Sequence, residues 1–327
     1  MRAIVCNAFA PPEQLVVETR DAAELPPGSI RVQVTACGVN FVDGLFVQGL
    51  YQIKPPTPFV PGSEIAGVIT ELGPQVTGFA VGDRVLASVG LGGFADEVIL
   101  RAGQAIAVPE GVTDTQAATL TQSYCTGWFA LVHRAGLADP ARVGEWLLVL
   151  GAGGGVGLAA CDIGRALGLR VIAAASSRSK RDAALAAGAE VVIDSSTEDV
   201  KARAKEISGG GVDAIYDPVG GELAERCLRA LRYDGQLLVI GFASGDIPRL
   251  PANQILLRNR RVVGVDWGMW AMEHPDRQRQ LFAEVLAGIT DGRLHPAEPT
   301  TYPFDQVAVA LRDLLERRAA GKVALIP

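Results

Sequence analysis

The sequence contains few of the residues that bind metals or form disulfides. It has three histidines and five cysteines in 327 residues, and no two cysteines form a Cys-x-x-Cys pair. None of the histidines pairs with another histidine or with a cysteine at the spacing of a zinc site. Scattered cysteines are typical of reduced thiols, so the composition indicates a cytoplasmic protein without a disulfide framework.

Long apolar runs and an excess of positive charge are missing too. No run is long enough to span a bilayer, and the first residues, MRAIVCNAFAPPEQ, lack the apolar core of a signal peptide. With 30 Lys and Arg against 36 Asp and Glu, the formal net charge is −6. These absences argue against nucleic-acid and membrane partners. The chain has 49% apolar residues and a length that suggests about two domains.

The most informative motif is the stretch 146–157, WLLVLGAGGGVG. An apolar run of strand length enters a glycine cluster, and a helical pattern follows at once. The spacing Ala152-x-Gly154-x-x-Gly157 is typical of a dinucleotide-binding turn, in which free N–H groups and the helix dipole attract phosphate. We therefore predict a dinucleotide site at the first βα turn of a Rossmann sheet, formed by Gly153, Gly154, Gly155, Val156 and Gly157. A glycine-rich turn without a ligand is the alternative.

The hydrophobic pattern divides the chain into two kinds of sequence. Residues 1–120 hold short β-branched runs bounded by Gly and Pro, which indicate a small barrel or folded sheet, with Asp114 expected to cap a helix. Residues 121–262 alternate strands and helices, one of them expected to end at Gly235, and predict a doubly wound parallel sheet. Residues 263–327 predict two amphipathic helices and a final strand that returns to the first domain.

The residues after the second strand of the parallel sheet indicate which nucleotide binds. A site for NAD has an Asp or Glu about 20 residues past the glycines, which holds the ribose hydroxyl. This chain instead has Ser176, Ser177, Arg178 and Lys180. Hydroxyls and cations hold a 2′-phosphate, so the sequence predicts NADPH. The alternative is that these cations belong to the solvated start of a helix.

Taken together, these motifs give a resemblance to a known family. The chain resembles the medium-chain dehydrogenase/reductase superfamily, and within it the zinc-free quinone oxidoreductases related to zeta-crystallin. The resemblance implies an α/β fold with a GroES-like, β-rich catalytic domain (1–120 and 263–327), a Rossmann NADPH-binding domain (121–262), a cleft between them, and a homodimer. It rests on GVNFVDGLFVQGLY (38–51), PFVPGSEIAGVITELG (58–73), VTGFAVGDRV (76–85), GGFADEV (92–98), GAGGGVG (151–157), DPVGGELAERCLRAL (217–231) and AAGKVAL (319–325).

The resemblance raises the question of zinc. Zinc-dependent alcohol dehydrogenases of the superfamily have a Cys ligand at the position of Asn40 and a His ligand at the position of Ser63. An amide and a hydroxyl do not replace a thiolate and an imidazole, so we expect no metal and a structural or hydrogen-bonding role for Glu64. Without a Lewis acid the oxidation of an alcohol is difficult, whereas a quinone or an enone needs only a hydride and modest polarisation of its oxygen.

The resemblance also implies site residues in the first domain. Asn40 and Tyr51 are expected near the nicotinamide as hydrogen-bond donors to a carbonyl, with Asp43 beside them. The alternatives are a turn residue for Asn40, a packed loop aromatic for Tyr51, and an orienting role for Asp43.

Four further cofactor contacts are expected in the second domain: Thr126, Phe242, Ser244 and Trp267. Thr126 is alternatively a helix threonine bonded to its own backbone, and Trp267 a core tryptophan. Two departures from the family pattern matter here. Thr121 and Gln122 replace its usual Pro-Val, which affects pocket shape, and Ser195 replaces a Tyr that helps to hold the 2′-phosphate.

Three functions fit these observations. The favoured one is an NADPH-dependent, zinc-independent reductase of a quinone or another conjugated carbonyl, a small-molecule partner. An enoyl-thioester reductase is the second, although it needs a cationic cluster for a carrier phosphate, and the first domain shows no obvious one. An NADPH-binding structural or regulatory protein without activity is the third.

Overall fold

The chain divides into two units, and the computed structural model describes all residues from Met1 to Pro327. The first unit combines Met1–Gln122 with Ala297–Pro327, and the second is Ser123–Pro296. The return to the first unit therefore occurs at Ala297, whereas the sequence suggested residue 263.

Helix packing explains this later boundary. The first two α-helices after residue 263 are α9 (Trp267–Glu273) and α10 (Pro275–Thr290), and both lie within the second unit. The indole of Trp128 donates a 2.7 Å hydrogen bond to Glu284, and the rings of Phe129 and Trp270 lie 4.6 Å apart. These contacts join partners far apart in sequence, so the hydrophobic pattern of the tail could not reveal them.

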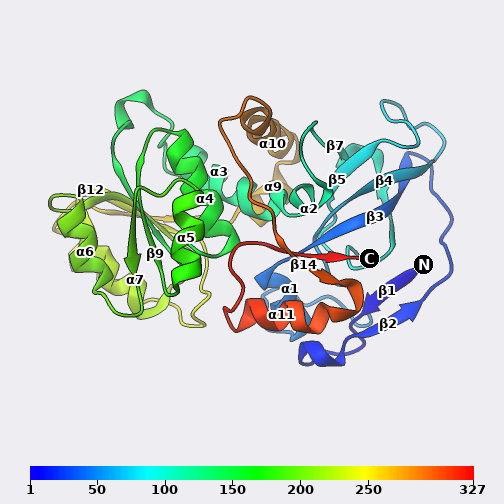
Figure 1. Ribbon diagram of the computed structural model, residues 1–327, viewed down its shortest axis with the longest axis horizontal. Helices are drawn as coiled ribbons and strands as arrows, with labels where there is room; N and C mark the ends of the chain where they lie inside the picture. The colour runs from blue at the N-terminus through cyan, green and yellow to red at the C-terminus, as the bar shows by residue number, and fades with distance from the viewer. The chain divides into compact units, whose positions relative to one another are not determined.

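The first unit is built on a seven-stranded sheet (Figure 1). Its long central strand, β3 (Ser29–Val39), pairs antiparallel with β4 (Glu64–Leu72) and with β15 (Val323–Ile326). The final strand of the chain therefore returns to this unit, as predicted. The other elements of the unit are β1 (Arg2–Val5), β2 (Val16–Thr19), α1 (Phe41–Val47), β5 (Arg84–Ser88), β6 (Glu97–Arg101), β7 (Ile106–Ala107), α2 (Asp114–Ala117), β14 (Thr300–Pro303) and α11 (Val307–Leu315).

The second unit contains a six-stranded parallel sheet, in the order β10-β9-β8-β11-β12-β13. This confirms the predicted doubly wound architecture. The strands are β8 (Trp146–Leu150), β9 (Arg170–Ala175), β10 (Val191–Asp194), β11 (Val212–Asp217), β12 (Leu231–Val239) and β13 (Arg261–Gly264). The other helices are α3 (Thr126–Trp128), α4 (Gly155–Ala166), α5 (Arg178–Ala186), α6 (Val200–Ile207), α7 (Gly221–Cys227) and α8 (Ala252–Leu256).

Helices cover this sheet in two layers (Figure 1). Helix α4 packs against α3 and α5, and α6 packs against α7. The α6–α7 layer covers a buried core to which Leu148, Ile172 and Ile215 of the sheet contribute. Because β8 lies at the centre, all five of its residues are buried, which explains the continuous apolar run in the sequence.

Two local predictions were wrong. The residue that caps α2 is Thr113, whose hydroxyl accepts from the Gln116 amide, and not Asp114. The helix expected to reach Gly235 ends with a short 3-10 turn at Ala230, and Gly235 lies inside β12. Asp234 adopts a positive φ of 58°, and the pairing with β11 shifts register here, so a bulge carries a helix-like pattern into a strand.

No helix combines the length and hydropathy needed to cross a membrane. All five cysteines are free and buried. Burial raises the pKa of the Cys161 and Cys227 thiols to about 12, so these side chains are packing groups and not nucleophiles.

Candidate functional sites in the two units

The glycine turn of the second unit joins β8 to α4. Gly151 has a positive φ of 58°, and the Gly154 amide donates to the Gly151 carbonyl at 3.0 Å, which closes the turn. Helix α4 then begins at Gly155 and runs for 12 residues. Since the first N–H groups of a helix have no partner inside it, the amides of Gly155, Val156 and Gly157 face the turn as free donors.

Close approaches explain why the turn needs glycines. A Cβ on Gly157 would lie 2.5 Å from the Gly151 carbonyl oxygen, and one on Gly153 would lie 2.4 Å from Cβ of Lys180. The stem of Lys180 therefore rests directly on the glycine turn. This contact joins the two motifs that the sequence analysis had treated separately.

The cations after β9 differ in their freedom to bind a ligand. Arg181 forms a 2.9 Å ion pair with Asp194 and donates to the Ala175 carbonyl, so it serves the structure. Arg178 is exposed, with its nearest carboxylate, that of Asp182, 3.8 Å away. Ser177 caps α5 by accepting from the Lys180 amide, and Ser176 is exposed. Ser176, Arg178 and Lys180 thus lie at the carboxyl end of β9 beside the glycine turn.

The ends of β11 and β12 meet the same edge of the sheet. Asp217 accepts from the amides of Val219 and Gly220, and its buried position raises the pKa of its carboxyl group. A Cβ on Gly151 would touch Val219 at 2.8 Å, and one on Gly220 would touch the Phe242 ring at 2.8 Å. Phe242 therefore shares this edge with the glycine turn, as predicted from strand order.

The other three predicted cofactor contacts, Ser244, Thr126 and Trp267, have different surroundings. Ser244 stands next to Phe242, and its amide donates to the Val219 carbonyl at 2.9 Å. Thr126 is half-buried in the helical segment that opens the unit. Trp267 is 7% exposed and its indole donates to Gln278 at 2.7 Å, which anchors α9 to α10 as a core residue would.

The turn and its surroundings suit a dinucleotide. A phosphate needs free amides and close backbone approach, and a 2′-phosphate needs hydroxyls and cations. The glycine turn supplies the free amides and the close backbone approach. Ser176 supplies a hydroxyl, and Arg178 and Lys180 supply the cations.

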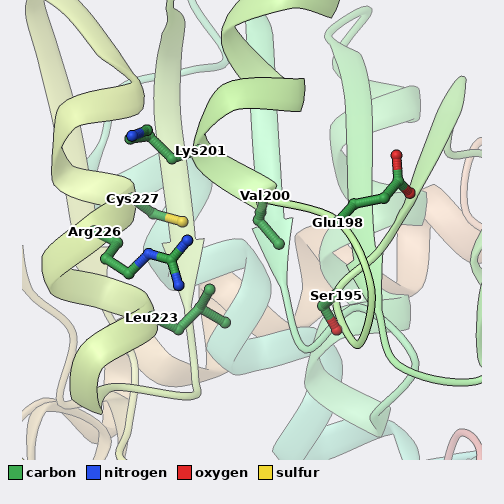
Figure 2. A pocket seen from close by; sticks show the side chains of 7 residues that line it. All are labelled: Ser195, Glu198, Val200, Lys201, Leu223, Arg226 and Cys227. Atoms are coloured by element: carbon green, nitrogen blue, oxygen red, sulfur yellow. The ribbon is translucent and has the colours of Figure 1, made fainter.

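A separate pocket in the same unit has a lining whose charges are already paired (Figure 2). Glu198 accepts from the Asp194 amide and from Arg203, and Arg226 pairs with Asp199 at 3.1 Å. These pairs leave little free charge for a ligand. Its lining residues are Ser195, Glu198, Val200, Lys201, Leu223, Arg226 and Cys227.

The first unit gathers polar side chains at one end of three adjacent strands. Asn40 follows β3, Ser63 precedes β4, Glu64 is the first residue of β4, and Lys322 precedes β15. The Asn40 amide nitrogen donates to Glu64 at 2.9 Å and to the Ser63 hydroxyl at 3.4 Å. The Lys322 ammonium donates to the Asn40 carbonyl oxygen at 2.5 Å and to Glu64 at 2.7 Å. We call Asn40, Asp43, Ser63, Glu64 and Lys322 the polar cluster.

Glu64 holds this cluster together. Its side chain is 1% exposed, and its second oxygen accepts from the Gln122 amide at 3.0 Å. A Cβ on Gly38 would lie 2.6 Å from Cγ of Glu64 and 2.2 Å from the Ala118 carbonyl oxygen. Glycine at 38 therefore makes room for the carboxylate, and Glu64 has the hydrogen-bonding role that the sequence suggested.

Asp43 is the most perturbed carboxyl group of the cluster. Asp43 is fully buried. One of its carboxylate oxygens accepts from the backbone N–H of Asn40 at 2.7 Å, and the other oxygen has no hydrogen-bond partner. Burial raises the pKa of Asp43 to about 7; the nearby Glu64 charge adds to this effect, and the backbone N–H of Asn40 and the Lys322 charge oppose it. At neutral pH this carboxyl group therefore exists in both protonation states.

The structure brings together only part of the predicted catalytic set. Asn40 and Asp43 touch, whereas the Tyr51 ring packs on Phe46 with the ring centres 4.8 Å apart. Cys37 donates to the Gly93 carbonyl in the core and stays out of the cluster. Lys322 is the member that sequence reasoning missed. Its only signal was its place in the AAGKVAL motif, because 282 positions separate it from Asn40.

Comparison with known proteins matches both units. The alcohol dehydrogenase GroES-like domain model matches residues 26–110, which agrees with the predicted architecture of the first unit, and the zinc-binding dehydrogenase model matches residues 155–286.

Individual relatives extend over nearly the whole chain. A quinone oxidoreductase-like protein 2 homolog of Nematostella vectensis is 37% identical, over 99% of this chain and 88% of that protein. Quinone oxidoreductase of Mus musculus is 33% identical, over 100% of this chain and 98% of that one. The crystal structure of Escherichia coli quinone oxidoreductase complexed with NADPH superposes with a TM-score of 0.86 at 29% identity and covers 100% of both chains.

The buried Asp43 predicts a pH-dependent stability. The pKa of Asp43 is 3.8 in the unfolded chain and about 7 in the fold. Its contribution to the free energy of unfolding is therefore fully present below pH 4 and is lost as the pH rises to 7. That loss is on the order of 4 kcal/mol at most. We expect Asp43→Asn to remove this decline from urea unfolding curves measured between pH 4 and 8.

An exposed carboxylate provides the control for this measurement. Asp182→Asn, on the surface of α5, is expected to keep the wild-type profile. Identical pH slopes for Asp43→Asn and wild type would contradict the assignment.

Proposed function

Because the chain belongs to the quinone oxidoreductase branch of the medium-chain dehydrogenase/reductase superfamily, we propose that it is an NADPH-dependent reductase of quinones or other conjugated carbonyl compounds. When bound, NADPH supplies the hydride that reduces such an acceptor. The observation that carries the proposal is the contact between Lys180 and the glycine turn, because it joins a phosphate cradle to a cation.

The residues of the second unit would hold the cofactor. The free amides at the start of α4 bind the pyrophosphate, and Gly153, Gly154 and Gly157 permit its close approach. Ser176, Arg178 and Lys180 bind the 2′-phosphate, whose charge an acidic residue there would repel. Thr126, Phe242, Ser244 and Trp267 remain predicted contacts.

The polar cluster of the first unit would bind the acceptor. Asn40, Asp43 and Tyr51 are the residues predicted there, and the cluster adds a charged ammonium to them. A hydrogen-bond donor near the acceptor's oxygen stabilises the negative charge that develops there on reduction.

We also propose that the reaction does not use zinc. The side chains at the two ligand positions, Asn40 and Ser63, are an amide and a hydroxyl 3.4 Å apart. Lys322 places an ammonium against Asn40 and Glu64, and this positive charge opposes a second cation at the same place. The donor set therefore suits an ammonium better than a metal ion.

The Rossmann sheet offers an edge for a second copy of the chain. Strand β13 pairs only with β12, so no strand pairs with its outer N–H and C=O groups, of which the Gly264 carbonyl accepts from Arg134 at 3.0 Å. The edge exposes apolar side chains: Val262 is 39% exposed, and Leu256 and Leu257, which lead into it, are 75% and 69% exposed. We propose that two copies pair along β13 to form a homodimer.

The remaining partners and the location follow from composition. The net charge of −6 suits a small neutral acceptor and gives no affinity for nucleic acid. The five free, buried cysteines fit a reducing compartment, and the cytoplasm stays the predicted location.

A panel of acceptors tests the function directly. We expect the purified protein to oxidise NADPH with 1,4-benzoquinone and with an α,β-unsaturated ketone, and to contain no stoichiometric zinc by elemental analysis. Preference for an enoyl thioester would favour the second hypothesis, and tight NADPH binding without any turnover would favour the third.

A charge reversal at Lys180 tests the phosphate assignment. We expect Lys180→Glu to raise KM for NADPH by roughly 10- to 100-fold, because a charge-assisted hydrogen bond of about 1.5–3 kcal/mol is lost. KM for NADH should change little. Lys205→Glu, on the outer helix α6, serves as the control, and equal increases for both nucleotides would contradict the proposal.

A charged residue on the edge strand tests the dimer. Val262→Lys places an ammonium on the pairing edge, so we expect a dimeric wild type and a monomeric variant in sedimentation equilibrium. Val143 is 64% exposed and lies far from β13 in sequence. The matched control is therefore Val143→Lys, which should stay dimeric. A monomeric wild type would overturn the proposal.

A further inference from the structure

The pairing of three strands fixes the position of Lys322. Strand β15 pairs antiparallel with β3 so that Val323 lies opposite Val39. Continued by one residue, this register sets Lys322 opposite Asn40. On the other side of β3, Gly38 lies opposite Glu64. The backbone therefore brings an ammonium, an amide and a carboxylate to one end of the sheet, independently of any flexible loop.

The Asn40 side chain already uses both of its N–H donors within the polar cluster. Its amide nitrogen has two N–H groups, and these point to Glu64 at 2.9 Å and to Ser63 at 3.4 Å. Its carbonyl oxygen accepts from Lys322. Asn40 was predicted to donate to the acceptor's oxygen, yet both of its donors already have partners.

The donors of Lys322 are only partly used. An ammonium has three N–H groups, and two of them go to Asn40 and to Glu64. The side chain is 13% exposed, so it is held rigidly but still reaches the surface of the unit. The third N–H is therefore a positively charged donor at the surface, fixed in position by two hydrogen bonds.

We infer that Lys322 is a further catalytic residue, whose third N–H donates a hydrogen bond to the carbonyl oxygen of the acceptor. This inference rests on the proposed function. Charge-assisted hydrogen bonds are stronger than neutral ones, and a donor that is already oriented needs no rearrangement as negative charge develops on the oxygen. In this arrangement Asn40 and Glu64 are positioning residues, because they act through Lys322.

A double variant separates the catalytic role of Lys322 from a structural one. The pair of Lys322 with the buried Glu64 also stabilises the fold, so Lys322→Met by itself leaves a buried carboxylate without its partner and destabilises the protein. The double variant Lys322→Met/Glu64→Gln removes both charges together. Glu64→Gln alone is the matched control, since it keeps the ammonium.

The experiment uses an acceptor that can bind without reacting. An α,β-unsaturated ketone labelled with 13C at its carbonyl is added to the protein in the presence of NADP+, which cannot donate a hydride. Isotope-edited infrared difference spectra then report the C=O stretch of the bound ketone. We expect a shift to lower wavenumber in wild type and in Glu64→Gln, and loss of that shift in the double variant.

Kinetics provide the second measurement. Relative to Glu64→Gln, the double variant should lose about 10²- to 10³-fold in kcat with the same ketone, the usual effect of removing one donor to a developing oxyanion. KM for NADPH should stay unchanged in both variants, and Lys205→Met should behave as wild type.

The outcomes separate the two proposals. A wild type that turns over, with equal carbonyl shifts in Glu64→Gln and the double variant, would overturn the role of Lys322 and leave the proposed function standing. A shifted carbonyl in wild type that is lost in the double variant, without any turnover, would support Lys322 as the donor and overturn the proposed function. Absence of a bound carbonyl signal in wild type would overturn the role of Lys322, and the proposed function with it only where turnover is absent too.

Discussion

The first unit depends on the close approach of three strands around Gly38. A single methyl group at this position would lie 2.2 Å from the Ala118 carbonyl oxygen and 2.6 Å from the Glu64 side chain. Either contact would push β4 or the end of α2 away from β3. The polar cluster therefore depends on an absent side chain: Glu64 lies in the space that glycine leaves, and both Asn40 and Lys322 bind to Glu64.

The second unit uses the same physical device for a different purpose. Glycines at 151, 153 and 157 let a strand, a helix and the Lys180 stem approach one another within distances that no side chain allows. In each unit a lysine is linked to such a glycine, because Lys180 rests on Gly153 and Lys322 binds the Glu64 carboxylate that lies against Gly38. The difference is in the neighbours, since Lys322 pairs with a buried carboxylate and Lys180 lies at the free amides of a helix start. The first arrangement surrounds an ammonium with acceptors, whereas the second combines free amides with an ammonium, as the proposed phosphate site requires.

Sequence reasoning succeeded where a signal is local. The run 146–150 and the glycines after it predicted β8 and the turn, because a central parallel strand is apolar throughout and a phosphate turn needs glycine. Sequence reasoning failed where a partner distant in sequence determines the secondary structure or the strand register. The pattern of 231–235 suits a continued helix, and only pairing with β11 and the positive φ of Asp234 make it a strand. The pairing of β15 with β3 was predicted in outline, but its register, which brings Lys322 to Asn40, was not.

An ammonium in the polar cluster also bears on which acceptors the protein can reduce. A divalent metal polarises an oxygen strongly enough to activate simple alcohols and ketones, whereas a lysine offers one charge shared with Glu64. The weaker donor suffices only where the substrate spreads the developing charge over its own conjugated system, as quinones and enones do. On the proposed function, the Lys322 ammonium thus favours conjugated acceptors by its limited strength, before the shape of any pocket adds its own selection.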